Sequence, residues 1–335
     1  MKNSTLAVIS GDALAPVPSA LPHQAMLGDS PAVTRMRDVI ERVAASEATA
    51  LVTGDSGSGK ELVAREIHAR SRRTGGRFVA INCAAVTATL LESELFGHVR
   101  GAFTDARSHR DGLFVQAGGG TLFLDEVGEM PLEMQAKLLR AVEERAVRAV
   151  GSDTAVAVHV RLITATNRNL EDEVAAHRFR SDLYYRLNVV EIRVPPLRER
   201  GDDILLLARS FLRQHADETG RPVAELSGEA ARCLLDYPWP GNVRELHNCM
   251  LRAVTLSRAQ EIKVDDLPAR VREDQSGRTD FLPENPEDLM SMEELQRRHL
   301  VRVLAAVDGN KTRAARILAI DRRTLYRLAS RLQVS

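Results

Sequence analysis

The sequence predicts an α/β protein built on a parallel sheet with helices on both faces, followed by two all-helical units. Up to the prolines Pro195 and Pro196, short apolar runs alternate with segments of helical periodicity. This order is typical of parallel sheets whose crossover connections are helices. Beyond those prolines the strand-like runs stop and only helical periodicity continues. A helical unit is therefore expected to follow the sheet.

The composition is that of a folded globular chain. Of the 335 residues, 44% are apolar and 27% are charged, which suits domains that bury a core. Lys plus Arg and Asp plus Glu both number 46, so the net charge does not indicate a nucleic-acid partner. The three cysteines are far apart and lack metal-ligand spacing, which favours reduced thiols. No apolar run has the length of a signal-peptide core or a membrane span, so we expect a cytoplasmic protein without a membrane partner.

Residues 1–25 carry Pro, Ser, Ala and Gly without periodicity and predict a flexible tail. A helix is expected after Ser30, because Pro31 suits a first helical turn and Val33, Met36 and Ile40 recur at helical spacing. Strands are predicted at 50–53, 78–82, 121–125 and 156–166, with helices at 61–71 and 132–144. These elements form the expected nucleotide-binding part, 26–196.

Four further helices are predicted within 197–271, a lid-like helical unit. They lie at 202–218, 227–236, 241–257 and 264–271. Residues 272–291 are rich in Asp, Glu, Pro, Gly and Ser and predict a linker. The last unit, 292–335, is expected to hold three short helices.

A glycine-rich run between a strand-like and a helical segment carries the strongest chemical signal. Its members are Gly54, Asp55, Ser56, Gly57, Ser58, Gly59 and Lys60. Glycines let backbone N–H groups turn around phosphates, the helix N-terminus adds its dipole, and a lysine reaches the terminal phosphates. Glu61 occupies the place where Ser or Thr usually binds magnesium, so metal binding depends more on other groups. The alternative is a glycine-rich surface turn.

An apolar strand ending in two acids supplies the second half of an ATPase site. Asp125 and Glu126 follow the run 121–124, and carboxylates at the carboxyl end of a strand can hold magnesium and orient water beside a triphosphate. Asp125 is the metal candidate, and Glu126 is the candidate that polarises the attacking water. The alternative is a solvated acidic turn.

Together with further motifs, this chain resembles the AAA+ domain of sigma-54-dependent transcriptional activators, or bacterial enhancer-binding proteins. The resemblance covers about residues 25–270 and continues through the C-terminal unit. It rests on the P-loop with Glu61 after its lysine, on Glu-Leu-Phe-Gly-His at 94–98, and on Gly-Ala-Phe-Thr-Asp-Ala at 101–106. Further matches are the runs at 179–187, 195–200 and 237–246.

The resemblance implies an AAA+ P-loop fold with a helical lid, and ATP with Mg²⁺ as ligands. Asn82 resembles a switch residue that hydrogen-bonds Glu126, although it could be a strand-end cap. Asn167 resembles the first sensor and Arg244 the second. Arg180 and Arg186 resemble paired arginine fingers that reach a neighbouring subunit's phosphate and stabilise transition-state charge. Either arginine could instead be a surface residue in an ordinary ion pair.

The segment of Gly101, Ala102, Phe103, Thr104, Asp105 and Ala106 resembles the family's contact with sigma-54 RNA polymerase. An exposed aromatic residue such as Phe103 favours a contact role, and the alternative is a buried anchor of a local turn. Asp105 replaces the glycine usual in the family, which adds charge and removes backbone freedom. This departure changes the segment that is expected to couple ATP hydrolysis to sigma-54.

The C-terminal unit predicts DNA binding. Residues 293–335 hold ten Lys or Arg residues against four acids, and helix, short turn, basic helix is the arrangement of a helix-turn-helix. The unit resembles the Fis type, and Arg322, Arg323, Thr324 and Arg327 are the candidates that face the major groove. A solvated basic hairpin is the alternative. Basic charge provides backbone affinity and does not reveal the DNA sequence that is read.

The resemblance therefore implies an activator that binds double-stranded enhancer DNA through dimeric units. It would assemble with itself into a hexameric ring and use ATP hydrolysis to remodel the sigma-54 polymerase toward the open complex. Only about 25 residues precede the predicted core, so we expect no receiver domain and control by a separate regulatory protein or by abundance. Two other classes stay open: an AAA+ chaperone, which needs no 101–106 motif, and a DNA-binding repressor that only senses nucleotide.

Overall fold

The computed structural model describes residues 26–103, 108–219, 225–257 and 261–273, and in the C-terminal part mainly 310–318 and 320–332. The expected tail, positions 274–291 of the expected linker, and Thr104, Asp105 and Ala106 lie outside the described residues. Arg272 and Glu273, the first two residues of the expected linker, are instead helical. The chain divides into two units, the first ending at Pro268 and the second beginning at Ala269. The expected sheet part and all but the last three residues of the expected lid part thus belong to the first unit.

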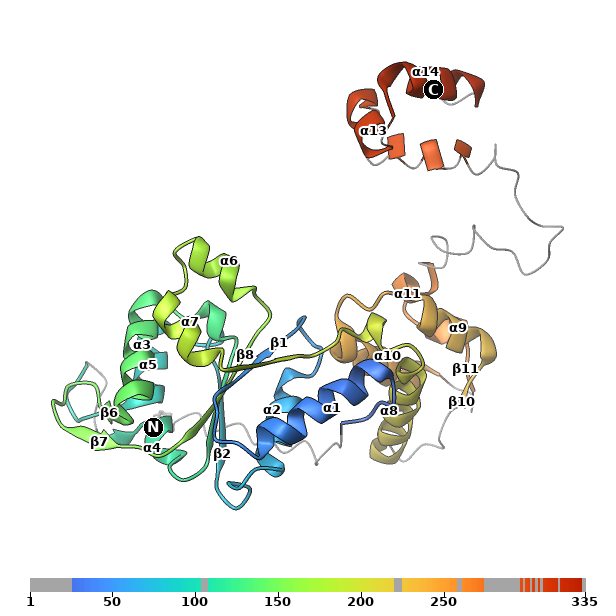
Figure 1. The fold of residues 1–335 in the computed structure, drawn as a ribbon. Coiled ribbons are helices and arrows are strands. Elements are labelled where there is room, and N and C mark those ends of the chain that lie inside the picture. The colour runs from blue at the N-terminus through green and yellow to red at the C-terminus, as the bar shows by residue number, and fades with distance from the viewer. Residues whose placement is uncertain are drawn as a thin grey trace, which may run out of the picture. The chain divides into compact units, whose positions relative to one another are not determined.

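A five-stranded parallel sheet is the centre of the first unit (Figure 1). Its order is β2 (Phe78–Asn82), β5 (Thr121–Asp125), β8 (Arg161–Thr166), β1 (Ala50–Thr53) and β9 (Val190–Arg193). Because all five strands are parallel, their carboxyl ends meet at one edge. The segments that follow β1, β2, β5 and β8 therefore gather there.

Alternate side chains of the strands enter two cores on opposite faces of the sheet. In β5, Leu122 and Leu124 join one core, while Phe123 joins the other. Helices α1 (Pro31–Ala44) and α2 (Lys60–Ala69) contribute to the core of Phe123. Helices α3 (Ala88–Phe96), α5 (Leu132–Glu144) and α7 (Ser181–Leu187) contribute to the core of Leu122. The expected arrangement of helices on both faces is confirmed.

Smaller elements complete the α/β part. The two-stranded pairs are β3 (Gly97–His98) with β4 (Arg110–Asp111), and β6 (Ala146–Arg148) with β7 (Ala155–Ala157). The short helices are α4 (Leu113–Gln116), α6 (Leu170–Ala175), and the 3₁₀ turns Val127–Glu129 and Leu197–Glu199.

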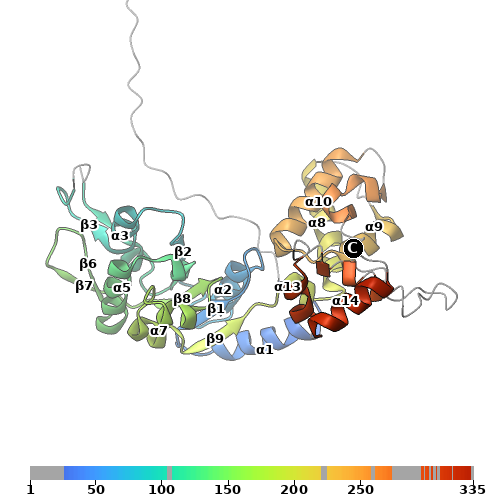
Figure 2. The same ribbon diagram turned by 90° about the horizontal axis from the view of Figure 1, so that it is seen from above.

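The lid consists mainly of three helices (Figure 2). They are α8 (Asp203–Thr219), α9 (Gly228–Asp236) and α10 (Asn242–Leu256), and the short strands β10 (Glu225–Leu226) and β11 (Glu261–Ile262) pair beside them. A 3₁₀ turn, Val264–Asp266, and helix α11 (Ala269–Glu273) stand where one helix, 264–271, was predicted.

Helices α13 (Lys311–Ile317) and α14 (Arg322–Arg331) belong to the second unit. Asn310 caps α13 by accepting from the N–H groups of Thr312 and Arg313. Ala314, Ala315 and Leu325 are buried in a core of their own. The expected helix at 294–306 is described only at scattered positions.

Two sequence expectations about strands were incomplete. The predicted strand 156–166 is two strands, β7 and β8, since Ala155–Ala157 pairs with β6 in a hairpin and only Arg161–Thr166 enters the central sheet. Strand β9 was not predicted, although its pairing with β1 completes the sheet edge. Among the described helices, none is both long and apolar enough to cross a membrane.

Candidate nucleotide-binding site

The P-loop lies at the carboxyl edge of the sheet, between β1 and α2. Gly57 and Gly59 have φ of 74° and 105°, conformations that only glycine adopts without strain. A Cβ on Gly57 would lie 2.5 Å from the carbonyl oxygen of Gly241, so the lid packs directly on the loop. Lys60 begins α2, is 7% exposed, and donates from Nζ to the Gly54 carbonyl at 3.0 Å.

Glu126 lies next to this lysine. Its Oε1 is 3.2 Å from Lys60 Nζ, and its Oε2 accepts from the backbone N–H of Asn167 at 3.1 Å. Glu126 has φ of 52°, a strained conformation that is frequent at functional sites. The structure thus brings together the P-loop lysine, the candidate carboxylate and the segment after β8 that carries the first-sensor candidate.

Asn82 contacts the other carboxylate. Its side-chain amide donates to Asp125 Oδ2 at 3.2 Å, and its Oδ1 accepts from the Ala84 N–H. The expected hydrogen bond from Asn82 to Glu126 is therefore wrong for this structure. The reason is register: Asn82 and Asp125 are paired residues at the ends of β2 and β5, whereas Glu126 has turned toward Lys60.

The environment of the Asp125 carboxylate fits a magnesium ion. Burial first and the negative charge of Glu126 second raise the pKa of Asp125, while Lys60 opposes the shift. A carboxylate kept in such a place is stabilised by a cation, and Mg²⁺ typically binds one or two carboxylates together with phosphate oxygens and water. Glu61 is turned to Arg65, with an Nη2–Oε1 distance of 2.7 Å. Of these two acids, Asp125 therefore has the environment that suits a cation better.

The lid reaches the P-loop through α10. Asn242 is fully buried with φ of 52°, its Oδ1 accepts from the Leu197 N–H at 2.8 Å, and its Nδ2 donates to the Ser56 carbonyl at 3.0 Å. Arg244 donates from its backbone N–H to the Gly57 carbonyl, and its guanidinium lies 3.4 Å from Ser56 Oγ. Arg244, the second-sensor candidate, therefore lies on the loop itself.

An apolar hollow beside the P-loop was not predicted from the sequence. It lies between the loop, the chain before α1 and the lid, and its lining includes Leu27, Gly59, Leu62, Leu207 and Phe211. An apolar hollow next to a phosphate loop suits a nucleobase. The one sequence signal was the apolar Met26 and Leu27 before Ser30, outside any element.

Arg200 also lines this hollow. Its guanidinium is buried and donates to the carbonyls of Ser58 and Pro195, and burial lowers the pKa of Arg200. Asp203 is also buried and accepts from the N–H groups of Asp29 and Ser30. These contacts tie the start of α1, the P-loop and the lid together.

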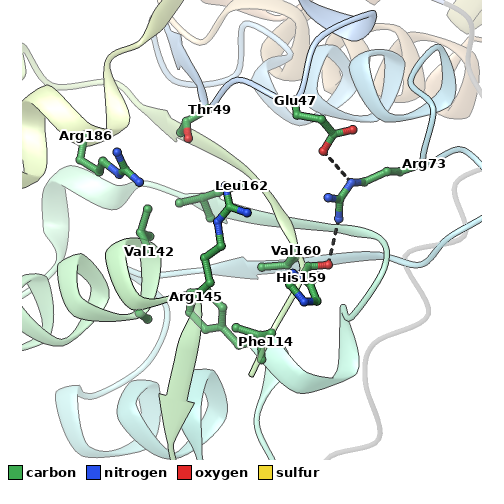
Figure 3. Close-up of a pocket in the computed structure, with 12 residues that line it drawn as sticks. Glu47, Thr49, Arg73, Phe114, Val142, Arg145, His159, Val160, Leu162 and Arg186 are labelled. Atoms are coloured by element: carbon green, nitrogen blue, oxygen red, sulfur yellow. Dashed lines mark hydrogen bonds and ion pairs between the residues drawn. The ribbon is translucent and has the colours of Figure 1, made fainter. Parts of the chain in front are cut away.

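The two finger candidates lie at opposite ends of α7. Arg180 forms a two-bond ion pair with Asp182 of its own chain, at 3.0 and 2.7 Å, which lowers the pKa of Asp182. Arg186 is exposed. Figure 3 shows it with Arg145 at a cavity of about 240 Å³ whose walls include Val142 and Leu162. Neither arginine contacts the P-loop of its own chain, among the interactions of the described residues.

The start of the 101–106 segment packs on a second loop. The His98 ring meets the Phe103 ring edge-on, with 5.0 Å between centroids, and Phe103 is 37% exposed. Val150 donates its N–H to the Gly97 carbonyl and accepts from the Val99 N–H. Phe103 is therefore half-exposed rather than fully projecting, and the base of its loop is joined to the loop between β6 and β7.

On α14, Arg322, Arg323 and Arg327 are exposed. Thr324 differs, because its hydroxyl donates to Asp321 Oδ2 and its N–H donates to Asp321 Oδ1. Thr324 thus takes part in capping the helix. Tyr326, 48% exposed with Lys311 Nζ 5.2 Å from its ring centroid, was not among the sequence candidates.

A P-loop beside two carboxylates at the carboxyl edge of a parallel sheet defines a P-loop nucleoside triphosphatase. Comparison with protein families narrows this class. Residues 26–193 match the sigma-54 interaction domain, 198–281 match an AAA+ ATPase lid domain, and 291–328 match the Fis family of bacterial regulatory proteins.

Known relatives agree along nearly the whole chain. The transcriptional regulatory protein ZraR of Salmonella typhi is 48% identical over 318 residues, 95% of this chain and 71% of the relative. The response regulator protein PilR of Pseudomonas aeruginosa is 47% identical over 90% of this chain and 68% of the relative. A crystal structure of NtrX from Brucella abortus in complex with ATP has a TM-score of 0.70 at 35% identity, covering 92% of this chain and 70% of that one.

The chain belongs to the sigma-54-dependent transcriptional activators, with an AAA+ ATPase domain, a helical lid and a Fis-type helix-turn-helix. The fold, the ATPase activity and the activator function expected from the sequence are thereby confirmed.

Proposed function

We propose that this activator hydrolyses ATP at sites shared between adjacent protomers of a hexameric ring. Lys60, Asp125 and Glu126 act within one protomer, and Arg180 and Arg186 reach the site of the next. The observation that carries this proposal is the separation of the two groups. Lys60, Asp125 and Glu126 lie together at the P-loop. Arg180 precedes α7 as its N-cap and Arg186 lies in its last turn, and neither contacts those three residues in the interactions of the described chain. An arginine supplied from a neighbour is an established way to stabilise phosphoryl-transfer charge.

Within one protomer, the ion pair of Lys60 with Glu126 supports a simple sequence of events. When the phosphates of ATP attract Lys60, Glu126 loses its cationic partner and keeps only the N–H of Asn167. Its carboxylate is then available to polarise the attacking water. Magnesium bound at Asp125 supplies charge neutralisation to the phosphates.

The ion pair of Arg180 with Asp182 is intramolecular. In the ring, Arg180 exchanges this exposed partner for a phosphate. The exchange costs little, because exposed ion pairs contribute little to stability. The adenine base is placed in the apolar hollow beside Gly59 and Phe211, and Arg244 senses the phosphates from the lid.

Mixing of two inactive variants tests the shared site. Glu126→Gln lacks its own water-activating carboxylate but has intact arginines, and Arg180→Ala has the reverse defect. An equimolar mixture is expected to hydrolyse ATP although each variant alone is inactive, since mixed rings contain complete sites. An inactive mixture, with both variants assembled and binding ATP, refutes sites shared between protomers.

We propose that the 101–106 segment contacts sigma-54 and that the joined loops at Gly97 and Val150 carry the motion of the nucleotide site to it. Thr104→Ala is expected to retain ATP turnover and lose transcription from a sigma-54 promoter. Transcription at the wild-type level would contradict the contact.

We propose that Arg322, Arg323 and Arg327 contact DNA in dimeric units bound to a pseudo-palindromic site. Their exposure on the basic helix α14 supports this role, whereas Thr324 contributes by capping that helix. Arg327→Ala is expected to weaken binding to enhancer DNA in a gel-shift assay, with ATP turnover unchanged. A repressor that only senses nucleotide would bind DNA without the ATP turnover described above.

A further inference from the structure

Gln135 is a fully buried polar side chain that the proposed mechanism does not use. It lies in the first turn of α5, the helix that packs on α7 (Figures 1 and 2). Its neighbour along the helix, Met134, belongs to the apolar core. An amide in such a place requires partners for all its polar atoms, since each unsatisfied one is costly.

All the hydrogen-bonding groups of this amide are engaged by two short backbone segments. Nε2 donates to the Met130 carbonyl at 2.7 Å and to the Arg178 carbonyl at 3.0 Å, and Oε1 accepts from the Arg180 N–H at 2.8 Å. Met130 ends the 3₁₀ turn that follows Glu126. The other segment is the one that carries the finger candidate Arg180. Gln135 thus joins the chain after Glu126 to the backbone of Arg180.

A second connection runs parallel to this one. Arg168, next to Asn167, pairs with Glu129 and with Glu173, and Glu173 pairs with Arg178 at 2.8 Å. The segment before α7 is therefore also tied, through Glu173 and Arg168, to residues that lie close in sequence to Glu126 and to Asn167. Among the described residues, however, Gln135 is the side chain that accepts from the Arg180 N–H, whereas the Arg180 carbonyl accepts from the Tyr184 N–H within α7.

We propose that Gln135 is a positioning residue, which fixes the position of Arg180 relative to the chain segment that follows Glu126. Gln135 would thereby link the nucleotide site of one protomer to the arginine finger that the same protomer extends to the next. The inference rests on the proposed function, because it requires Arg180 to act on a neighbour. Glu126 and Met130 belong to one short turn, so a movement of Glu126 shifts the Met130 carbonyl and, through the rigid amide, the Arg180 N–H. A buried side chain with every polar atom bonded has no alternative arrangement at low cost.

Gln135→Met tests this proposal, because methionine keeps the length and helix propensity and removes the three hydrogen bonds. Misplacing a catalytic group by about 1 Å costs on the order of 100-fold, so turnover is expected to fall by about that factor. The Kd for ATP is expected to stay within about twofold, since the P-loop is untouched. Arg140→Gln, an exposed position of the same helix, is the control and is expected to leave turnover unchanged.

Mixing decides where Gln135 acts. A Gln135→Met protomer has an intact P-loop and carboxylates, so Glu126→Gln protomers with well-placed arginines are expected to restore its turnover. The mixture of Arg180→Ala with Glu126→Gln is the reference. If the reference recovers and the Gln135→Met mixture does not, Gln135 acts on its own protomer's site and the inference is overturned. If the reference itself fails, the shared site is refuted instead.

A merely structural role gives a different pattern, in which ATP binding and turnover fall together and mixing restores neither. Should Gln135→Met fail to fold, Gln135→Glu takes its place in the same mixing experiment. Glutamate keeps the shape and the acceptor for the Arg180 N–H, but it turns an oxygen toward the carbonyls of Met130 and Arg178. Its turnover is also expected to fall and to be restored by Glu126→Gln. Absence of recovery there equally overturns the inference.

Discussion

Replacing Asn242 with alanine is expected to destabilise the junction between the lid and the P-loop. Asn242 is fully buried, and its amide bonds both the Leu197 N–H and the Ser56 carbonyl. Its backbone has φ of 52°, a region that asparagine tolerates better than alanine. The substitution therefore removes two hydrogen bonds and strains one residue.

The three effects give the expected magnitude. A buried N–H left without a partner, here that of Leu197, costs about 1–3 kcal/mol. Loss of the partly buried bond to Ser56 costs about 0.5–1.5 kcal/mol. Alanine in the left-handed region adds about 1 kcal/mol. Together, Asn242→Ala is expected to lower the free energy of unfolding by roughly 3–5 kcal/mol.

Denaturant unfolding without nucleotide measures this change, and Asn242→Gly is the matched control. Glycine loses the same two hydrogen bonds but adopts φ of 52° without strain. Its cost is therefore expected to be about 1 kcal/mol smaller than that of alanine. The reasoning is refuted if Asn242→Ala costs less than about 1 kcal/mol, or if glycine is as harmful as alanine.

Three further predictions concern the same site. The raised pKa of Asp125 means that folding disfavours its ionised form, so stability falls as pH rises from the unfolded pKa through the folded one. Asp125→Asn is accordingly expected to raise the thermal midpoint at neutral pH while abolishing ATP turnover; a lower midpoint would contradict this account. Burial raises the pKa of the Cys83 thiol to about 12. A thiol-specific reagent at pH 8 is therefore expected to leave Cys83 unmodified until the protein unfolds. Modification of the native protein at the rate of a free thiol would show instead that the site opens. Gly57→Ala places a Cβ 2.5 Å from the Gly241 carbonyl oxygen at a φ of 74° and is expected to weaken ATP affinity measurably. Gly75→Ala is the control, because open space surrounds Gly75, and it is expected to leave ATP affinity unchanged. Equal ATP affinity of the two variants would argue against a tight contact between lid and loop.

Much of the site could be predicted from the sequence because its signals are local. A phosphate loop needs glycines and a lysine at fixed spacing, and Gly54 to Lys60 stand between β1 and α2 as expected. The strand before Asp125 needs a buried apolar run, and β5 has the predicted bounds. The same holds for α5, whose periodicity predicted Leu132–Glu144.

Contacts between distant segments could not be predicted in this way. The break between β7 and β8 depends on which neighbour each half pairs with: Ala155–Ala157 pairs with β6, whereas Arg161–Thr166 pairs with β5 and β1. The partner of Asn82 depends on the register of two strands 43 positions apart in the chain. The apolar hollow combines residues from α1, α2, α8 and α10, which have no common sequence pattern.

By itself, the sequence determined that this protein binds phosphates with a P-loop, that two acids follow a buried strand, and that a basic helical pair ends the chain. Spacing along one segment is sufficient for each of these features, because backbone conformation and periodicity act over a few residues. Only the tertiary structure decided that Glu126 faces Lys60, that Asn242 joins the lid to the loop, and that Gln135 holds Arg180. These contacts arise when separate elements pack, and buried polar atoms then bond whichever partners the packing brings within reach.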